Sequence, residues 1–137
     1  MNPFSNLVQL IKNIHKSLVV VGNGQRGFGA GFVLNSDGLI LTNNHVLAES
    51  SLVVTLPGGQ QVPAEQVARN PGIDLALLKV DVTGLLPVIL GDSRALQVGQ
   101  PVVAVGHPWG QHGAATFGVI SSLSSARGKD RTEPLDL

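Results

Sequence analysis

Short runs of β-forming residues, each closed by a turn signal, follow one another from Ser17 to Val80 and limit the fold more than any other feature. Runs of this length, rich in Val, Ile and Leu, are typical of strands in a small β-barrel. About six of them occur, at 17–21, 31–34, 39–42, 52–56, 61–68 and 75–80. Between the second and third, Asn35-Ser36-Asp37-Gly38 indicates a hairpin turn, because Asp-Gly suits positive φ. The pattern predicts an all-β fold with a six-stranded first barrel.

The residues on either side predict a helix and the beginning of a second β unit. Asn2-Pro3 is typical of a helix start, and apolar residues follow at helical spacing up to Ile14. Beyond a linker at 83–87, two further strand runs lie at 101–106 and 114–122, before a polar loop at 124–134. We therefore expect an N-terminal helix at 1–16, a first barrel at 17–84, and a linker with an incomplete second barrel at 85–137.

Composition excludes several classes of function. Hydrophobic residues make up 43% of the 137 residues, as in a globular chain rather than a disordered one. Basic and acidic residues number nine each, so no charge excess favours nucleic acid or a membrane surface. No apolar run reaches the roughly 18 residues that a spanning helix needs. The absence of cysteine excludes disulfides, thiol catalysis and cysteine metal sites.

A histidine and an aspartate stand where proton-transfer chemistry would need them. His45 follows the strand run 39–42 and the polar residues Asn43-Asn44, so a rigid strand end would hold its imidazole. Asp74 lies in a turn just before the run 75–80, and two predicted strands separate it from His45. Two intervening strands are enough to return the chain to the neighbourhood of His45, so that Asp74 could lie beside it. The order His then Asp is that of the imidazole and orienting carboxylate of a serine-protease triad.

These residues carry a resemblance to a known family. The chain from about Ser17 onward resembles the HtrA/Deg branch of trypsin-like serine endopeptidases. The matching segments are Gly29–Leu34, Asp37-Gly38, Thr42-Asn43-Asn44-His45-Val46, Asp74–Val80, Leu90–Ser93, Val98–Gln100 and Thr116–Ser121. The resemblance implies a chymotrypsin-like fold, unfolded or misfolded proteins as substrates, and no cofactor. It implies His45 and Asp74 as the catalytic residues.

The family's nucleophile is a serine in a Gly-Asn-Ser-Gly-Gly-type segment, and that segment is not in this sequence. We therefore expect a serine endopeptidase by lineage whose 137 residues, cut before the serine and the oxyanion hole, are inactive alone. The alternative is a non-catalytic pseudo-protease or a protein-interaction module. The reading frame beyond codon 137 distinguishes the two. Strands left without partners also predict a homo-oligomer or a partner chain that supplies strands.

Ser93 is the serine that most resembles a nucleophile, because it follows Gly91-Asp92. The next residues, Arg94-Ala95, are not the glycines whose amides would form an oxyanion hole. A serine that caps the turn into Arg94–Leu96 is the favoured interpretation.

Three other patterns are assigned structural roles. Gly22–Gly27 has the form GxGxxG, but the glycine-rich residues after it do not favour the helix that a dinucleotide site requires. A hairpin loop is favoured there. His107 and His112 lack a third ligand, so we expect an aromatic-bearing loop around Trp109 and no metal. His15, at the end of the predicted helix, is assigned to the surface or to a C-cap.

The N-terminus gives limited information on location. The first residues lack a basic start, and Gln9, Lys12 and Asn13 interrupt their apolar stretch, so they do not form a signal peptide. The chain as given is expected in the cytoplasm. The family's frequent periplasmic or extracytoplasmic location is the alternative.

Overall fold

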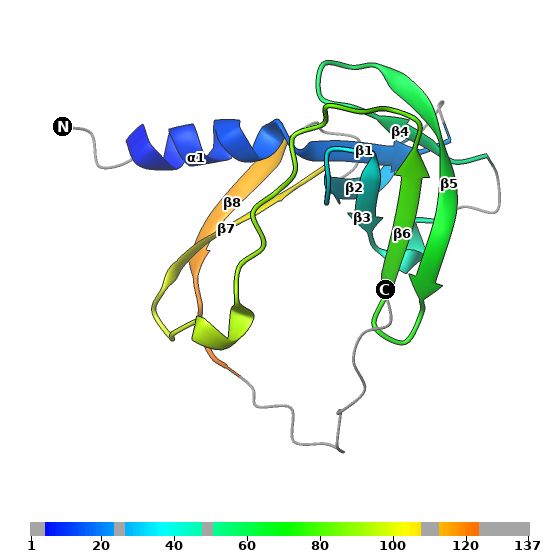
Figure 1. Cartoon of the computed structure of the whole chain (residues 1–137). Helices are drawn as coiled ribbons and strands as arrows, with labels where there is room; N and C mark the ends of the chain where they lie inside the picture. The colour runs from blue at the N-terminus through cyan, green and yellow to red at the C-terminus, as the bar shows by residue number, and fades with distance from the viewer. Residues whose placement is uncertain (1–4, 24–26, 48–50, 108–112, 124–137) are drawn as a thin grey trace.

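A closed six-stranded barrel forms the larger part of the computed structural model, which describes residues 5–23, 27–47, 51–107 and 113–123. The strands are antiparallel and follow one another in the order β1-β2-β3-β6-β5-β4 (Figure 1). Their bounds are β1 Leu18–Gly22, β2 Gly27–Val33, β3 Leu39–Thr42, β4 Val53–Thr55, β5 Gln61–Asn70 and β6 Leu75–Val80. The predicted all-β fold and six-stranded barrel are confirmed.

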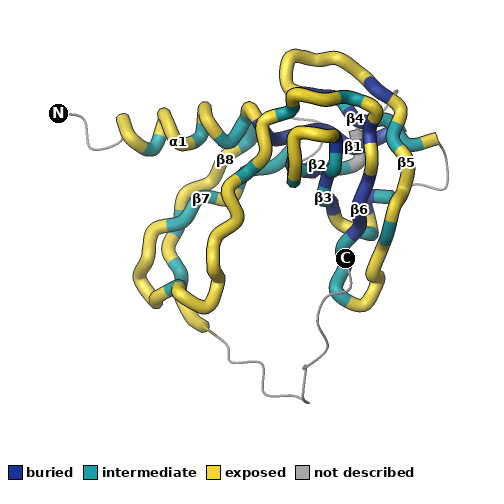
Figure 2. Tube along the Cα trace, viewed as in Figure 1, coloured by how far each residue is buried: buried dark blue, intermediate teal, exposed yellow. Residues whose placement is uncertain are grey.

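The barrel interior is filled by side chains from alternate positions of its strands. Val19 and Val21 of β1, Ile40 of β3 and Leu78 and Val80 of β6 are each at most 1% exposed. Alternation follows from the two-residue period of a strand, which sends every second side chain inward. Dark blue segments accordingly gather on the barrel strands in Figure 2. Burial of these branched side chains is the main source of stability for the barrel.

β2 begins at Gly27, earlier than the run at 31–34 predicts. Glycine has a low strand propensity, but Gly29 pairs with Val21 of β1 and lies against Val46. A Cβ on Gly29 would stand 2.5 Å from the Val46 side chain. The glycine is therefore required for close packing, which a propensity scale does not contain.

β5 runs past its predicted end because of a bulge. Its register against β6 shifts between Gln66 and Ala68, which leaves the side chain of Val67 56% exposed. A bulge inserts an extra residue and bends the strand. Here it lets β5 continue to Asn70, so that the turn before β6 lies next to the end of β3.

Two strands outside the barrel form a second sheet. β7 (Pro101–Gly106) and β8 (Ala114–Val119) are antiparallel, and they are coloured mostly as exposed or intermediate in Figure 2. The linker from β6 is fastened to the barrel by Leu85 N–H to Ser36 O at 3.2 Å and by Val88 N–H to Val33 O at 2.9 Å. The predicted loop at 124–134 lies outside the described residues.

The helix α1 (Ser5–His15) precedes the barrel, and its last turn lies against Gly113, the residue before β8. The ring of His15 is so close to Gly113 that a Cβ there would stand 2.8 Å from it. The predicted cap at Asn2-Pro3 is outside the described residues. No helix in the described part of the chain is long and apolar enough to cross a membrane.

Candidate active site

The end of β3 and the 3₁₀ turn that follows it, η1 (Asn44–Val46), hold His45. Thr42 closes the strand, and its Oγ1 donates a hydrogen bond to Ala30 O on β2 at 2.8 Å. One residue after the histidine, Val46 is 5% exposed and belongs to the barrel core. The backbone of His45 is thus fixed on both sides, while its side chain is 71% exposed.

Asp74 is presented by the turn that joins β5 to β6. Its φ of 56° lies in the left-handed region, and it is the one non-glycine residue with positive φ in the described segments. Aspartate tolerates this region better than most residues do. Its carbonyl oxygen accepts hydrogen bonds from the Asn44 N–H at 3.1 Å and from Asn43 Nδ2 at 3.0 Å. Both donors belong to the segment that carries His45.

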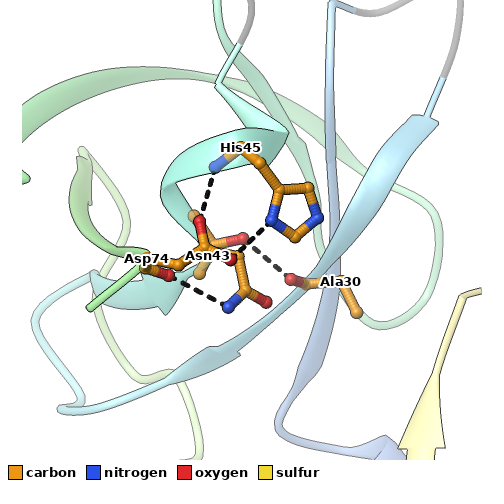
Figure 3. A network of polar contacts seen from close by, with 5 residues as sticks. Ala30, Asn43, His45 and Asp74 are labelled. Carbon is orange, nitrogen blue, oxygen red and sulfur yellow. Dashed lines mark hydrogen bonds and ion pairs between the residues drawn. The ribbon is translucent and has the colours of Figure 1, made fainter. Parts of the chain in front are cut away.

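The two side chains meet directly, as Figure 3 shows. His45 Nδ1 lies 2.6 Å from Asp74 Oδ2, and the His45 backbone N–H donates to Oδ1 at 2.9 Å. An ionised carboxylate only accepts hydrogen bonds, so Nδ1 carries the hydrogen. Nε2 is then the ring's acceptor. The predicted proximity of His45 and Asp74 is observed.

The same contacts lower the pKa of Asp74. The largest cause is the hydrogen bond from the His45 backbone N–H, followed by the one from its ring. Both stabilise the ionised form, and they outweigh the desolvation that acts in the opposite direction. The carboxylate therefore stays charged at neutral pH and keeps its role as acceptor.

We expect the contribution of Asp74 to stability to disappear in acid. A pKa lowered in the folded state gives a contribution that is fully present above the ordinary value of 3.8 and is lost as pH falls through the folded pKa. The check is the difference in free energy of unfolding between the native chain and Asp74→Asn, measured by denaturant titration at several pH values. The difference should be constant above about pH 5 and shrink below about pH 4. A difference that grows in acid would contradict the assignment.

Comparison with known proteins identifies the family. A family model described as a trypsin-like peptidase domain matches residues 29–135, which include the His45 and Asp74 segments. The chain belongs to the trypsin-like peptidase family. Within that family it lies in the HtrA/Deg branch that the sequence motifs predict.

Named relatives of this peptidase domain come from several bacteria. It is 42% identical over 119 residues to a probable periplasmic serine endoprotease, DegP-like, of Pseudomonas putida, an alignment that covers 84% of this chain and 24% of that protein. With the serine protease PepD of Mycobacterium tuberculosis it shares 41% identity over 107 residues, 70% of this chain and 23% of the relative. The chain spans about a quarter of the length of these relatives.

A solved structure supports the fold assignment. The HtrA-type protease AlgW with a decapeptide superimposes with a TM-score of 0.67 at 35% identity. The match covers 70% of this chain and 30% of that one. The chymotrypsin-like fold predicted for the peptidase domain is thereby confirmed.

Ser93 lies on the linker between β6 and β7. It is the first residue of a 3₁₀ turn, η2 (Ser93–Ala95), and its predicted capping role is wrong. The cap is Asp92, whose carboxylate accepts from the Arg94 N–H at 3.0 Å and pairs with the Arg94 guanidinium at 2.9 Å. A carboxylate one residue earlier makes a stronger, charge-assisted bond and takes the position from the hydroxyl.

The remaining candidate residues occupy other places in the peptidase domain. Gly22 and Gly27 face each other across the β1–β2 hairpin, as a hairpin loop requires. His15 and His107 line a pocket with the turn Pro57–Gly59, and neither His45 nor Asp74 is among its lining residues. His112 and Trp109 lie outside the described residues. Among the described residues, no group of three or more His, Cys, Asp and Glu side chains could hold a metal.

Sequence reasoning missed the contacts that hold Asp74 in place. The sequence pattern indicates only that Asn43 and Asn44 end a strand, yet Asn43 through its side chain and Asn44 through its backbone N–H donate to the Asp74 carbonyl oxygen. The available signal was the pair of amides next to the histidine, since such residues form local backbone bonds readily. Asp74 lies 31 residues beyond Asn43, so only the fold reveals the contact.

Proposed function

We propose that His45 and Asp74 are the general base and the orienting carboxylate of a serine endopeptidase. The carboxylate fixes the tautomer that leaves His45 Nε2 free to take a proton from a serine hydroxyl, and it stabilises the imidazolium that forms. The single observation that carries this is the double contact of Asp74 with one residue. Oδ2 accepts from the ring at 2.6 Å, and Oδ1 accepts from the backbone of the same histidine at 2.9 Å.

The exposure of the pair supports a chemical rather than a stabilising role. The side chains of His45 and Asp74 are 71% and 43% exposed. Exposed ion pairs contribute little to stability, because water screens them and ordering the side chains costs entropy. Four hydrogen bonds nevertheless converge on Asp74, and a gain in the stability of the fold does not explain them.

The nucleophile is a serine that these 137 residues do not contain, and the substrates are unfolded or misfolded proteins. None of the serines in the sequence has the glycines of an oxyanion-hole segment after it. We therefore propose that the 137-residue polypeptide alone is inactive, with the domain boundary near residue 84. Relatives named as serine endoproteases, and a relative solved with a decapeptide, support a peptide substrate.

A fluorophosphonate serine probe is expected not to label the isolated 137-residue chain. Intact proteases that lose one triad member keep roughly 10³–10⁴-fold catalysis over water through the oxyanion hole and substrate binding. Here those parts are missing as well. Intact-protein mass spectrometry after overnight incubation checks this, with an active serine protease as the positive control. Stoichiometric labelling at Ser93 would contradict the proposal.

A chimera tests the proposed roles directly. It joins residues 1–123 of this chain to the segment that follows in the Pseudomonas putida relative. We expect this chimera to cleave an unfolded casein-type substrate and to lose that activity when His45 is replaced with Ala. Retention of activity by the His45→Ala chimera would refute the role of His45.

The second sheet supports an alternative role in protein interaction. Phe117 and Val119 of β8 are 59% and 55% exposed and, two residues apart, lie on one face of the strand. β7 and β8 pair only with each other in the described part of the chain. We propose that this sheet accepts a strand from a second copy or another chain by β-addition.

The isolated chain is therefore expected to oligomerise through residues beyond about Leu85. Amide exchange should be faster in 101–119 than in 18–80, because the barrel lacks no strand. Hydrogen exchange with light scattering checks both points. A monodisperse monomer with equal protection in the two regions would exclude the interaction.

A further inference from the structure

The backbone of Asp74 is held in an unfavourable conformation. A φ of 56° costs an L residue free energy relative to the right-handed region, even for aspartate. Such a conformation persists only where surrounding contacts impose it. Two of those contacts reach its carbonyl oxygen, from the Asn44 N–H and from the Asn43 side chain, and they join the turn to the segment that carries His45.

The side chain of Asn43 does not cap the turn that it precedes. Asn43 is the N-cap residue of η1, where asparagine ordinarily accepts a hydrogen bond from the turn's own backbone. It makes no such cap bond. Its Nδ2 instead donates to Asp74 O at 3.0 Å, across to the β5–β6 turn (Figure 3). The amide is thus used to join the two segments of the site.

We propose that Asn43 is a positioning residue, whose side-chain amide holds the Asp74 backbone so that both carboxylate oxygens face His45. This inference deepens the proposed function and rests on it in regarding the pair as catalytic. Asn43 itself touches neither His45 Nε2 nor the carboxylate in the contacts of the site. It acts through Asp74.

The chemistry of the site follows from this arrangement. With the amide removed, the Asp74 carbonyl keeps the Asn44 N–H as its donor, and the left-handed φ is less strongly held. A change in φ turns the carboxylate relative to His45, so that the bonds to Oδ1 and Oδ2 lengthen together. Asn43 is exposed, so its truncation opens no cavity in the core and the barrel stays folded.

Three variants of the 137-residue chain separate positioning from capping. Asn43→Ala removes the amide that donates to Asp74 and the side-chain oxygen that could cap η1. Asn43→Ser restores a good N-cap residue but is too short to reach Asp74. Asn44→Ala is the matched control, because it removes the same atoms one residue later and leaves the Asn44 backbone N–H in place. Asn44 Oδ1 has no hydrogen-bond partner among the residues that the structure describes.

The readouts are amide exchange at residues 44 and 45 and the NMR titration of the Asp74 carboxyl carbon. Both amides donate to Asp74, so Asn43→Ala and Asn43→Ser should exchange about threefold to tenfold faster there, the effect of one lost hydrogen bond. The pKa of Asp74 should rise toward its ordinary value in both. Asn44→Ala should change neither quantity. Amide exchange and an Asp74 pKa unchanged from the native chain in Asn43→Ser would show a capping role and overturn the inference. Equal changes of the two quantities in Asn44→Ala and Asn43→Ala would also overturn it.

Kinetics in the chimera separate this inference from the proposed function. There Asn43→Ala should lower kcat about threefold to tenfold with KM unchanged, because the amide acts on the base and not on substrate binding. Loss of activity in His45→Ala with no effect of Asn43→Ala would refute positioning and keep the proposed function. The NMR changes combined with an active His45→Ala chimera would keep the positioning role of Asn43 and refute the proposed function.

Discussion

Replacing Asp74 with Asn in the chimera is expected to lower kcat about 10⁴-fold, as the same change does in another Ser-His-Asp protease. The amide is nearly isosteric, so the geometry of the turn should survive. Asparagine also tolerates positive φ as well as aspartate does. The amide NH₂ can, however, donate to His45 Nδ1. The ring hydrogen then moves to Nε2, and the base can no longer accept the proton of the serine.

Steady-state cleavage of an unfolded casein-type substrate measures the effect, with circular dichroism to show that the barrel is intact. Asp92→Asn is the matched control, because Asp92 is also an exposed aspartate with a hydrogen-bonded carboxylate, on the η2 turn. It should keep kcat within about twofold, since it touches neither His45 nor Asp74. A loss of less than tenfold in Asp74→Asn would show that Asp74 does not orient the base.

The barrel was predictable because local sequence and global fold agree in it. Runs at 39–42 and 75–80 coincide with β3 and β6 to the residue, since a short apolar run bounded by turn residues leaves little choice. The predicted strand bounds were wrong where contacts with residues distant in sequence determine where a strand begins or ends. Gly29 belongs to a strand because Val46 packs on it, and β5 is longer than predicted because a bulge carries it on.

The candidate site divides in the same way. His45 and Asp74 were predictable because chemistry restricts which residues can act as base and carboxylate. Asn43 was not, because an asparagine at a strand end has several uses and its partner is distant in sequence. The cap at Asp92 was missed for a related reason. Ser93 and Asp92 both suit that role, and the choice depends on where the 3₁₀ turn begins.

Leu78→Ala is expected to destabilise the barrel by about 2–5 kcal/mol. Leu78 is 0% exposed and lies in the middle of β6, paired with Ile40 of β3 and Gln66 of β5. Truncation removes buried carbon atoms and leaves a cavity that a closed barrel can refill only in part. Domains are stable by about 5–15 kcal/mol, so this loss is a large share of the total. Since β6 begins directly after Asp74, the site should lose order with it.

Denaturant titration followed by far-ultraviolet circular dichroism measures the change. Fluorescence is unsuitable, because the single tryptophan, Trp109, falls between β7 and β8 in the sequence and there is no tyrosine. Leu86→Ala is the matched control: the same atoms are removed from a linker side chain that is 52% exposed, and the change should stay within about 0.5 kcal/mol. Equal losses at the two leucines, or less than about 1 kcal/mol at Leu78, would mean that β6 is not the centre of the core.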